Sequence, residues 1–261
     1  MLRSLAFLTA MTAMTAVTAV TASAAPARFV ERSVDVQGRT YRYQVFVPEH
    51  LAAHPAVVLF LHGSGERGDD NQAPLSQGLP PWLQRHADFP AVVVVPQAPK
   101  HTEWTDKADA DMAMAALEAS VKEFHGDRKR LYLTGMSMGG YGAWQLAVDH
   151  PLTFAAAAIV CGGVTRIIDD PDDPNLFVHG VPDGTDAFTW VAKGVGALPV
   201  WMFHGADDNV VPTEQSRRMH AALVARKAEV KYSELPGVNH GSWDTAYATP
   251  DLWTWMFAHT R

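Results

Sequence analysis

Short apolar runs alternate with helix-like stretches along most of this chain, and this alternation limits the possible fold more than any other feature. Runs of this length are typical of parallel strands that are covered on both faces. They occupy residues 56–61, 91–95, 131–134, 154–160, 200–203 and 230–235. Helical patterns cover residues 108–124, 138–148, 214–226 and 250–259. The alternation predicts an α/β fold, with helices on both faces of a mostly parallel sheet.

An antiparallel pair of strands is expected before this alternation begins. Residues 29–36 and 41–47 have strand character and flank Gln37-Gly38, a typical turn between paired strands. Together with the apolar runs, this hairpin predicts a sheet of about eight strands. The length of 261 residues and the 48% apolar composition fit one large domain.

The first 25 residues have the character of an export signal. Arg3 gives a positive start, an apolar stretch follows, and Ala22-Ser23-Ala24 offers small residues for cleavage. A membrane anchor is the alternative, but threonines dilute the stretch and no basic stop-transfer segment follows it. We therefore predict a cleaved signal peptide at residues 1–25, a mature domain at 26–261, a periplasmic or secreted location, and no stable membrane insertion.

Charge and cysteine content exclude several classes of function. The formal net charge is −7, and no cluster of basic residues with interleaved aromatics is present, so nucleic acid is not an expected partner. Cys161 is the only cysteine and cannot form an internal disulfide. Because it ends an apolar run, we expect a buried, inert thiol rather than a nucleophile. No His/Cys cluster suggests a zinc site, and no metal or other cofactor is expected.

Residues 165–196 interrupt the strand and helix rhythm. The segment is rich in Asp, Pro and Gly and has little periodicity. Long loops in compact domains are often functional, so a substrate-covering lid or wall and a structural linker both stay open. The acidic run at residues 169–173 lacks the glycine and the spacing of a calcium loop and is expected to be a solvated turn.

A candidate nucleophile lies in Gly135-Met136-Ser137-Met138-Gly139. This pattern places a serine at a sharp turn between a strand and a helix, and both elements are predicted around it. The turn would expose the Ser137 hydroxyl at the carboxyl edge of the sheet, where open α/β sheets bind ligands.

A serine hydroxyl needs a general base, and in this architecture the acid and then the histidine follow the serine in the chain. Of the downstream histidines, only His240 follows the last strand in a loop that can reach the sheet edge. His204 ends a strand before Gly205 and is expected to be a structural imidazole that bonds loop backbone. Asp207 and Asp208 both follow the preceding strand, and geometry alone does not separate them as the acid that orients the base.

Acyl transfer also requires hydrogen-bond donors for the oxyanion. The backbone N–H of Met138 is expected to be one, because it follows the nucleophile at the positive end of a helix. The second is expected from the turn after residues 56–61, where the Ser64 N–H is favoured and Gly65 stays open. A phosphate-binding loop is excluded there, because the turn does not end in Gly-Lys-Ser/Thr.

Several motifs together resemble a known group of enzymes. They are Leu61-His62-Gly63-Ser64-Gly65-Glu66-Arg67-Gly68-Asp69-Asp70-Asn71, Pro96-Gln97-Ala98-Pro99, Gly135-Met136-Ser137-Met138-Gly139-Gly140, Cys161-Gly162-Gly163, His204-Gly205-Ala206-Asp207-Asp208-Asn209-Val210-Val211-Pro212 and Asn239-His240-Gly241-Ser242-Trp243. They resemble the phospholipase/carboxylesterase branch of the α/β-hydrolases, including its predicted peptidases and feruloyl-esterase-like enzymes. The resemblance runs from about Leu59 to the end of the chain. It implies the α/β-hydrolase fold and places the acid at the second of the paired aspartates, Asp208.

The resemblance also implies an activity. It suggests an exported serine hydrolase that cleaves carboxylic esters through an acyl-enzyme, with small-molecule or saccharide-linked esters as substrates. A peptidase or amidase with the same residues and a non-catalytic binding protein on the same fold are the alternatives. Trp104 and Trp243 are tentative substrate contacts, and for each of them plain packing stays open.

Overall fold

A computed structural model describes residues 28–167 and 176–261. The predicted signal peptide at residues 1–25 and the acidic run at 169–173 lie outside the described residues. Within the described ranges, no helix has the length and apolar character needed to cross a membrane.

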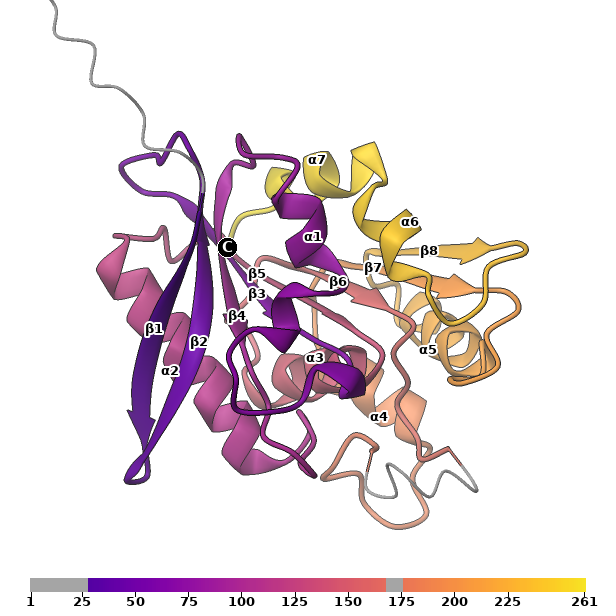
Figure 1. Ribbon diagram of the computed structural model, residues 1–261. Helices are drawn as coiled ribbons and strands as arrows, with labels where there is room; N and C mark the ends of the chain where they lie inside the picture. Colours follow the sequence, from indigo (N-terminus) through magenta and orange to yellow (C-terminus); the bar gives the residue numbers. More distant parts are fainter. Residues whose placement is uncertain (1–27, 168–175) are drawn as a thin grey trace, which may run out of the picture.

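Among the described residues, one sheet of eight strands forms the centre of the molecule, in the order β1-β2-β4-β3-β5-β6-β7-β8 (Figure 1). The β1–β2 and β2–β4 pairs are antiparallel, and the five other pairs are parallel. The strands are β1 (Arg28–Val36), β2 (Arg39–Val47), β3 (Ala56–Leu61), β4 (Ala91–Pro96), β5 (Leu131–Met136), β6 (Ala156–Val160), β7 (Val200–Gly205) and β8 (Val230–Leu235). The predicted mostly parallel sheet with an N-terminal hairpin is therefore confirmed.

The central strands are apolar on both faces because both faces are covered. Successive side chains of a strand point to opposite sides of the sheet. In β3, Val57 and Leu59 therefore belong to one hydrophobic cluster, whereas Val58 and Phe60 belong to the other. All six residues of β3 are buried, which explains its unbroken apolar sequence.

Helices form a layer on each side of this sheet (Figure 1). One layer contains α2 (Lys107–Glu123), α3 (Met138–Asp149), α4 (Ala187–Gly194) and α5 (Glu214–Ala225). The other contains α1 (Leu79–Leu83), α6 (Trp243–Tyr247) and α7 (Pro250–Ala258). Two short 3₁₀ helices, η1 (Ser64–Glu66) and η2 (Ala73–Leu75), lie between β3 and α1. The helices α1, α4 and α6 were not predicted, because each is too short to show a helical period.

The described part of the 165–196 segment packs on α3 and α5. The Gln215 side chain of α5 accepts hydrogen bonds from the backbone N–H groups of Val164 and Thr165, at 3.0 and 3.1 Å. The Gln145 side chain of α3 accepts one from the His179 N–H, at 2.7 Å. These contacts anchor the segment at Thr165 and at His179, and its action as a lid or wall stays a prediction.

Candidate active site

Ser137 occupies a strained turn between β5 and α3. Its φ of 52° and ψ of −121° lie in a region that side chains rarely adopt, and the surrounding structure must hold it there. Part of that support comes from β6, because the Ser137 N–H donates to the Val160 carbonyl oxygen at 2.9 Å. The turn leaves Ser137 partly exposed, whereas Met136 and Met138 on either side are buried.

The start of α3 lies directly against the end of β3. A methyl group at Gly139 would lie 2.0 Å from the Leu61 carbonyl oxygen and 2.7 Å from that of His62, so only glycine fits. This close approach brings the loop after β3 to the serine. A methyl group at Gly63 would lie 3.7 Å from Cβ of Ser137.

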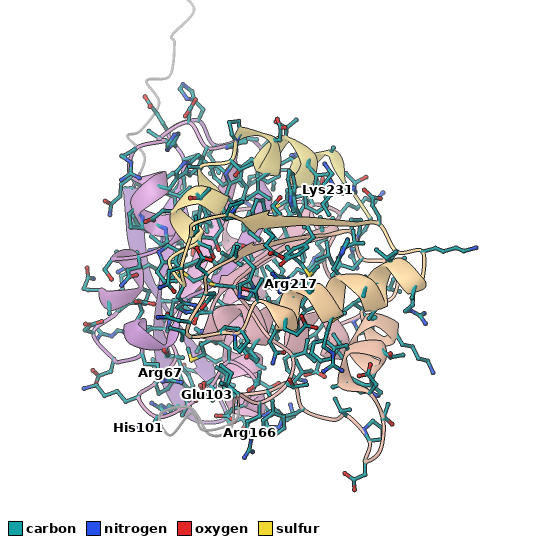
Figure 2. All side chains as sticks on the ribbon, turned by 90° about the vertical axis from the view of Figure 1, so that its right-hand side faces the viewer. Arg67, His101, Glu103, Arg166, Arg217 and Lys231 are labelled. Carbon is teal, nitrogen blue, oxygen red and sulfur yellow. The ribbon has the colours of Figure 1, made fainter. Side chains whose placement is uncertain are left out.

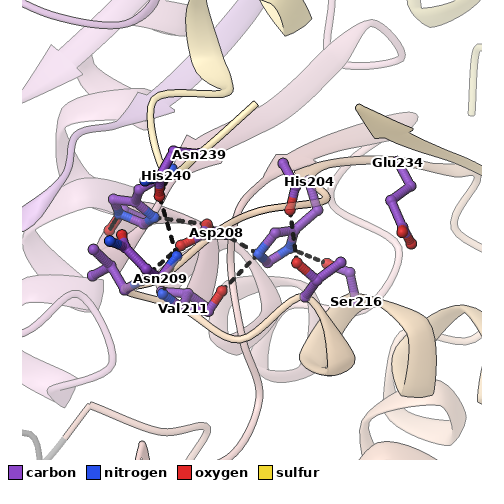
Figure 3. A network of polar contacts seen from close by, with 12 residues as sticks. His204, Asp208, Asn209, Val211, Ser216, Glu234, Asn239 and His240 are labelled. Atoms are coloured by element: carbon purple, nitrogen blue, oxygen red, sulfur yellow. Dashed lines mark hydrogen bonds and ion pairs between the residues drawn. The ribbon is translucent and has the colours of Figure 1, made fainter. Parts of the chain in front are cut away.

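The side chains of Ser137, His240 and Asp208 form a continuous hydrogen-bonded chain. His240 Nε2 lies 2.9 Å from Ser137 Oγ, and His240 Nδ1 lies 2.8 Å from Asp208 Oδ2 (Figure 3). Since a carboxylate only accepts, Nδ1 carries the proton, and in the neutral ring Nε2 is free to accept from the serine hydroxyl. The imidazole is 17% exposed, whereas the Asp208 side chain is completely buried.

Four donors surround the Asp208 carboxylate. Oδ1 accepts from the N–H groups of Val210 and Val211, each at 2.9 Å, and Oδ2 faces His240 and His204. Burial by itself raises the pKa of this carboxyl, but the hydrogen bonds from His204, His240 and Val210 outweigh it and leave the pKa well below its usual range. Asp207, by contrast, is exposed, and its backbone N–H bonds to the Val238 carbonyl.

The loops that carry the acid and the base are joined by Asn239 and Gly205. The Asn239 side-chain oxygen accepts from the N–H of Asn209 at 3.1 Å and from the N–H of His240 at 2.7 Å. A methyl group at Gly205 would lie 2.3 Å from the carbonyl oxygens of both Val238 and Asn239, so the two loops are in direct contact. The sequence reasoning gave no role to Asn239, although its position beside His240 is the signal that could have found it.

His62 holds the loop that follows β3. Its Nδ1–H donates to the Gly63 carbonyl at 2.6 Å, and its Nε2 accepts from the Ala98 N–H at 3.0 Å. Complete burial lowers the pKa of His62 to about 4, so the ring is neutral and both nitrogens have fixed roles. The indole of Trp104 donates to the His62 carbonyl at 2.9 Å and has no exposed surface, so it supports this loop from behind.

Further polar side chains tie the rest of this loop to the molecule. The Gln97 side chain donates to the Glu66 carbonyl at 3.0 Å and accepts from the Asn71 N–H at 2.6 Å. The guanidinium of Arg67 pairs with Glu103 at 2.6 Å, and Figure 2 shows these two side chains next to each other. The loop is therefore fixed on several sides before any substrate arrives.

Trp243 lies beside the imidazole of His240. The two rings meet edge to face, with their centroids 5.5 Å apart and an interplanar angle of 89°. The half-buried indole also lines a pocket of about 310 Å³ between α1 and α6, with Ser76, Gln77, Gly78, Pro81, Trp82, Arg85, Asp244, Tyr247 and Ala248. A larger pocket of about 720 Å³ lies between the start of α2 and the end of α3, and its lining includes neither Ser137, Asp208 nor His240.

In the part of the chain that the structure describes, one cluster has the residue types of a metal site. Ligand atoms of Cys161, Asp208 and His240 lie within 4.8 Å of one another. Metal binding at cysteine requires the thiolate, but burial raises the pKa of the Cys161 thiol to about 12. A metal would also have to replace the hydrogen bond between Asp208 and His240, so the donor set fits a metal poorly.

A family model provides the classification. The model of the prolyl oligopeptidase family matches residues 101–260, which is more than half of the chain. The chain belongs to the prolyl oligopeptidase family. The matched residues of this family member include Ser137, Asp208 and His240.

Two relatives of this prolyl oligopeptidase family member are an esterase by name and a protein described as secreted. "Probable feruloyl esterase C" of Aspergillus terreus is 26% identical over 155 residues, which cover 57% of this chain and 56% of that protein. An "Uncharacterized secreted protein" of Arthroderma benhamiae is 27% identical over 222 residues, which cover 75% of this chain and 22% of that protein. The chain thus spans about half the length of the first relative and about a fifth of the second.

A solved structure supports the same fold. The crystal structure of a thermostable esterase matches with a TM-score of 0.68 and 29% identity, over 89% of this chain and 63% of that chain. Together with the family match, this likeness confirms the α/β-hydrolase classification that the motifs predicted.

Proposed function

We propose that this protein is a serine hydrolase that cleaves carboxylic esters through a Ser-His-Asp mechanism without a cofactor. The observation that supports the proposal is the hydrogen-bonded chain from Ser137 through His240 to Asp208, with contacts of 2.9 and 2.8 Å. In such a chain the serine would act as the nucleophile, the histidine as the general base and the aspartate as the orienting acid.

In the first half of the reaction, Ser137 Oγ attacks the ester carbonyl carbon while Nε2 of His240 takes the hydroxyl proton. The carbonyl electron pair moves to the oxygen, and Asp208 stabilises the imidazolium that forms. The intermediate collapses as the bond to the alcohol oxygen breaks. His240 then gives its proton to the departing alcohol, and the acyl group stays on Ser137.

In the second half, water replaces the alcohol. His240 takes a proton from the water as its oxygen attacks the acyl carbon, and the proton then passes to Ser137 Oγ as the carboxylic acid departs. The N–H groups of Met138 and Ser64 would hold the oxyanion in both halves. Two observations favour them: Met138 is the first residue of α3, where a helix has unpaired N–H groups, and the loop of Ser64 lies against Ser137.

The substrate would be a small or saccharide-linked ester with a short or aromatic acyl group. The feruloyl esterase name of one relative favours aromatic acyl groups. Trp243 would form one wall of the substrate site, because its indole joins His240 to the pocket between α1 and α6. The predicted cleavage of residues 1–25 would place the mature domain outside the cytoplasm, which fits polymer-linked esters.

Labelling with a fluorophosphonate tests the proposal directly. Such a reagent bonds to an activated serine, so we expect one label per wild-type molecule and none on Ser137→Ala. Ser33→Ala, which removes an exposed serine of β1, is the matched control and should label like the wild type. A folded wild-type protein that stays unlabelled would contradict the proposal and favour a binding protein on the same fold.

A peptidase or amidase is the second candidate, and the prolyl oligopeptidase family match favours it. Amides differ from esters in their poorer leaving group, which must be protonated as it departs. Turnover of matched ester and amide substrates with the same acyl group separates the two candidates. Faster cleavage of the amide would assign the site to peptide bonds. Feruloyl and acetyl-sugar esters in the same panel would identify the acyl preference.

A further inference from the structure

His204 is a completely buried side chain that contacts the candidate catalytic acid. It lies near the end of β7, four residues before Asp208. Its Nε2 lies 2.9 Å from the Val211 carbonyl oxygen and 3.1 Å from Asp208 Oδ2 (Figure 3). Its Nδ1 lies 2.7 Å from Oγ of Ser216 in α5. The sequence indicated the bond to loop backbone but not the bond to the carboxylate.

These partners fix which nitrogen carries the proton. A carbonyl oxygen and a carboxylate can only accept hydrogen bonds, so Nε2 must be a donor. The Ser216 hydroxyl can donate, so a neutral ring accepts from it at Nδ1. The single Nε2–H therefore lies between two acceptors, the Val211 carbonyl oxygen and Oδ2 of Asp208, and Oδ2 is the same oxygen that receives Nδ1–H of His240.

We infer that His204 is a positioning residue that acts through Asp208. Its Nε2–H holds Oδ2 of the carboxylate, the oxygen that faces His240. The negative charge of Oδ2 is therefore stabilised by the N–H groups of both histidines. His204 touches no reacting atom, and the inference rests on the proposed function because it assigns Asp208 the role of acid.

Other ionisable groups lie near His204 and Asp208, and substitutions at His204 or Ser216 leave them unchanged. The Cys161 thiol at the end of β6 lies close to Asp208 and His240. Glu234 of β8 interacts electrostatically with His204 and is paired with Arg217 of α5 at 2.6 Å. The Tyr232 hydroxyl donates to the same Glu234 carboxylate at 2.9 Å. Arg217 thus already neutralises the Glu234 carboxylate, and Asp208 is the carboxylate that lies within 3.1 Å of His204.

Removal of the His204 donor should change the pH dependence of activity as well as the rate. Oδ2 would then have His240 as its one side-chain donor, and its charge would act more strongly on that imidazole. A more localised negative charge favours the protonated ring. The acid limb of the activity profile would therefore move to higher pH, while the freer carboxylate would orient the imidazole less well.

The experiment compares His204→Leu with His204→Gln by the pH dependence of kcat/KM. We expect the leucine variant to lose on the order of ten-fold in kcat, as for one charge-assisted hydrogen bond. We also expect its acid limb to move to higher pH by roughly half a unit or more. The glutamine amide can place a donor near the position of Nε2, so it should restore the wild-type limb. A merely structural role would lower the active fraction without moving the limb.

Ser216→Ala tests the same idea without removing the imidazole. The ring would lose the hydroxyl that anchors Nδ1 and would be held less firmly against Asp208, so a smaller shift of the limb in the same direction is expected. Ser120→Ala is the matched control, because it removes a buried serine of α2 that bonds to the Ala116 carbonyl. Unchanged acid limbs in both His204→Leu and Ser216→Ala, or a limb that moves to lower pH, would overturn the inference. Failure of the proposed function has a different signature, because the wild-type protein itself would then resist fluorophosphonate.

Discussion

At the scale of single residues, Asp207 and Asp208 differ only in their surroundings. The Asp208 side chain is buried, accepts three hydrogen bonds and contacts His204 at 3.1 Å, whereas Asp207 is exposed to solvent. The role of an orienting acid depends on such bonds, because they keep the carboxylate charged and aligned on the base. Neighbouring positions with the same side chain can therefore have very different effects on catalysis.

Asparagine substitutions at these two positions should separate them. Asp208→Asn offers His240 an amide in place of the carboxylate, which favours the wrong tautomer, so we expect kcat to fall by about 10⁴-fold. Asp207→Asn changes an exposed side chain and should stay within a few-fold of wild type. Steady-state hydrolysis of an activated ester measures both. The reverse order of effects would assign the acid to Asp207.

The sequence predicted the roles of single residues where a rule on chain order applied. It did not predict them where contacts between distant loops determine the role. Ser137 and His240 follow from a local motif and from the order of the residues, and the structure brings their side chains to 2.9 Å. The aspartate pair needed the family resemblance, because burial is not visible in two identical neighbours. The contact of His204 with Asp208 and the bridge formed by Asn239 depend on how loops pack, and only the position of Asn239 beside His240 hints at either of them in the sequence.

At the scale of secondary structure elements, the sequence predicted the strands well and the short helices poorly. Each central strand is a buried apolar run, so composition alone marks it. The helices α1 and α6 have five residues each, less than two turns, and α1 begins with consecutive prolines after Leu79. One turn of helix shows no amphipathic period, and tertiary packing determines whether it forms. The pocket beside Trp243 lies between these two helices and was therefore not predicted.

The contact between α3 and β3 makes a testable prediction about this level of structure. Gly139→Ala would place a methyl group 2.0 Å from the Leu61 carbonyl oxygen, so α3 must move away from the strand. We expect a loss of about 3 kcal/mol or more in unfolding free energy, together with a loss of activity, since the serine moves with the helix. Denaturant unfolding and ester hydrolysis measure the two effects.

Gly65→Ala is the control for that substitution. Gly65 lies in the loop next to Ser137, but a methyl group there would meet no atom within 4 Å. Its unfolding free energy should stay within about 1 kcal/mol of wild type. Equal destabilisation by both substitutions would show that the approach of α3 to β3 is not the constraint.

At the scale of the whole molecule, two buried ionisable side chains give opposite pH dependences of stability. Burial lowers the pKa of His62 to about 4 and raises that of Asp109 to about 6. The imidazole of His62 binds a proton more readily in the unfolded chain between pH 6.5 and 4. Acidification through this range therefore lowers the unfolding free energy by about 3 kcal/mol. The carboxylate of Asp109 binds a proton more readily in the folded chain between pH 6 and 3.8. Acidification through this range therefore raises the unfolding free energy by about 3 kcal/mol. The two contributions nearly cancel in the wild-type protein.

Asp109→Asn should expose the contribution of His62. The amide removes a buried negative charge and can still accept the hydrogen bond from Thr102, so at pH 7 we expect stabilisation by up to about 3 kcal/mol. On acidification to pH 4 this gain should disappear, and the unfolding free energy of the variant should fall because the contribution of Asp109 no longer offsets that of His62. The lowered pKa of Asp208 confines the loss of that carboxylate's contribution to pH values below 3.8, outside this window.

Denaturant unfolding at pH 7, 5 and 4 measures how the unfolding free energy of the variant depends on pH. Asp111→Asn in the same helix is the control and should keep the shallow wild-type dependence. An Asp109→Asn protein that is less stable at pH 7, with the same pH dependence as wild type, would show that burial does not raise the pKa of this carboxyl.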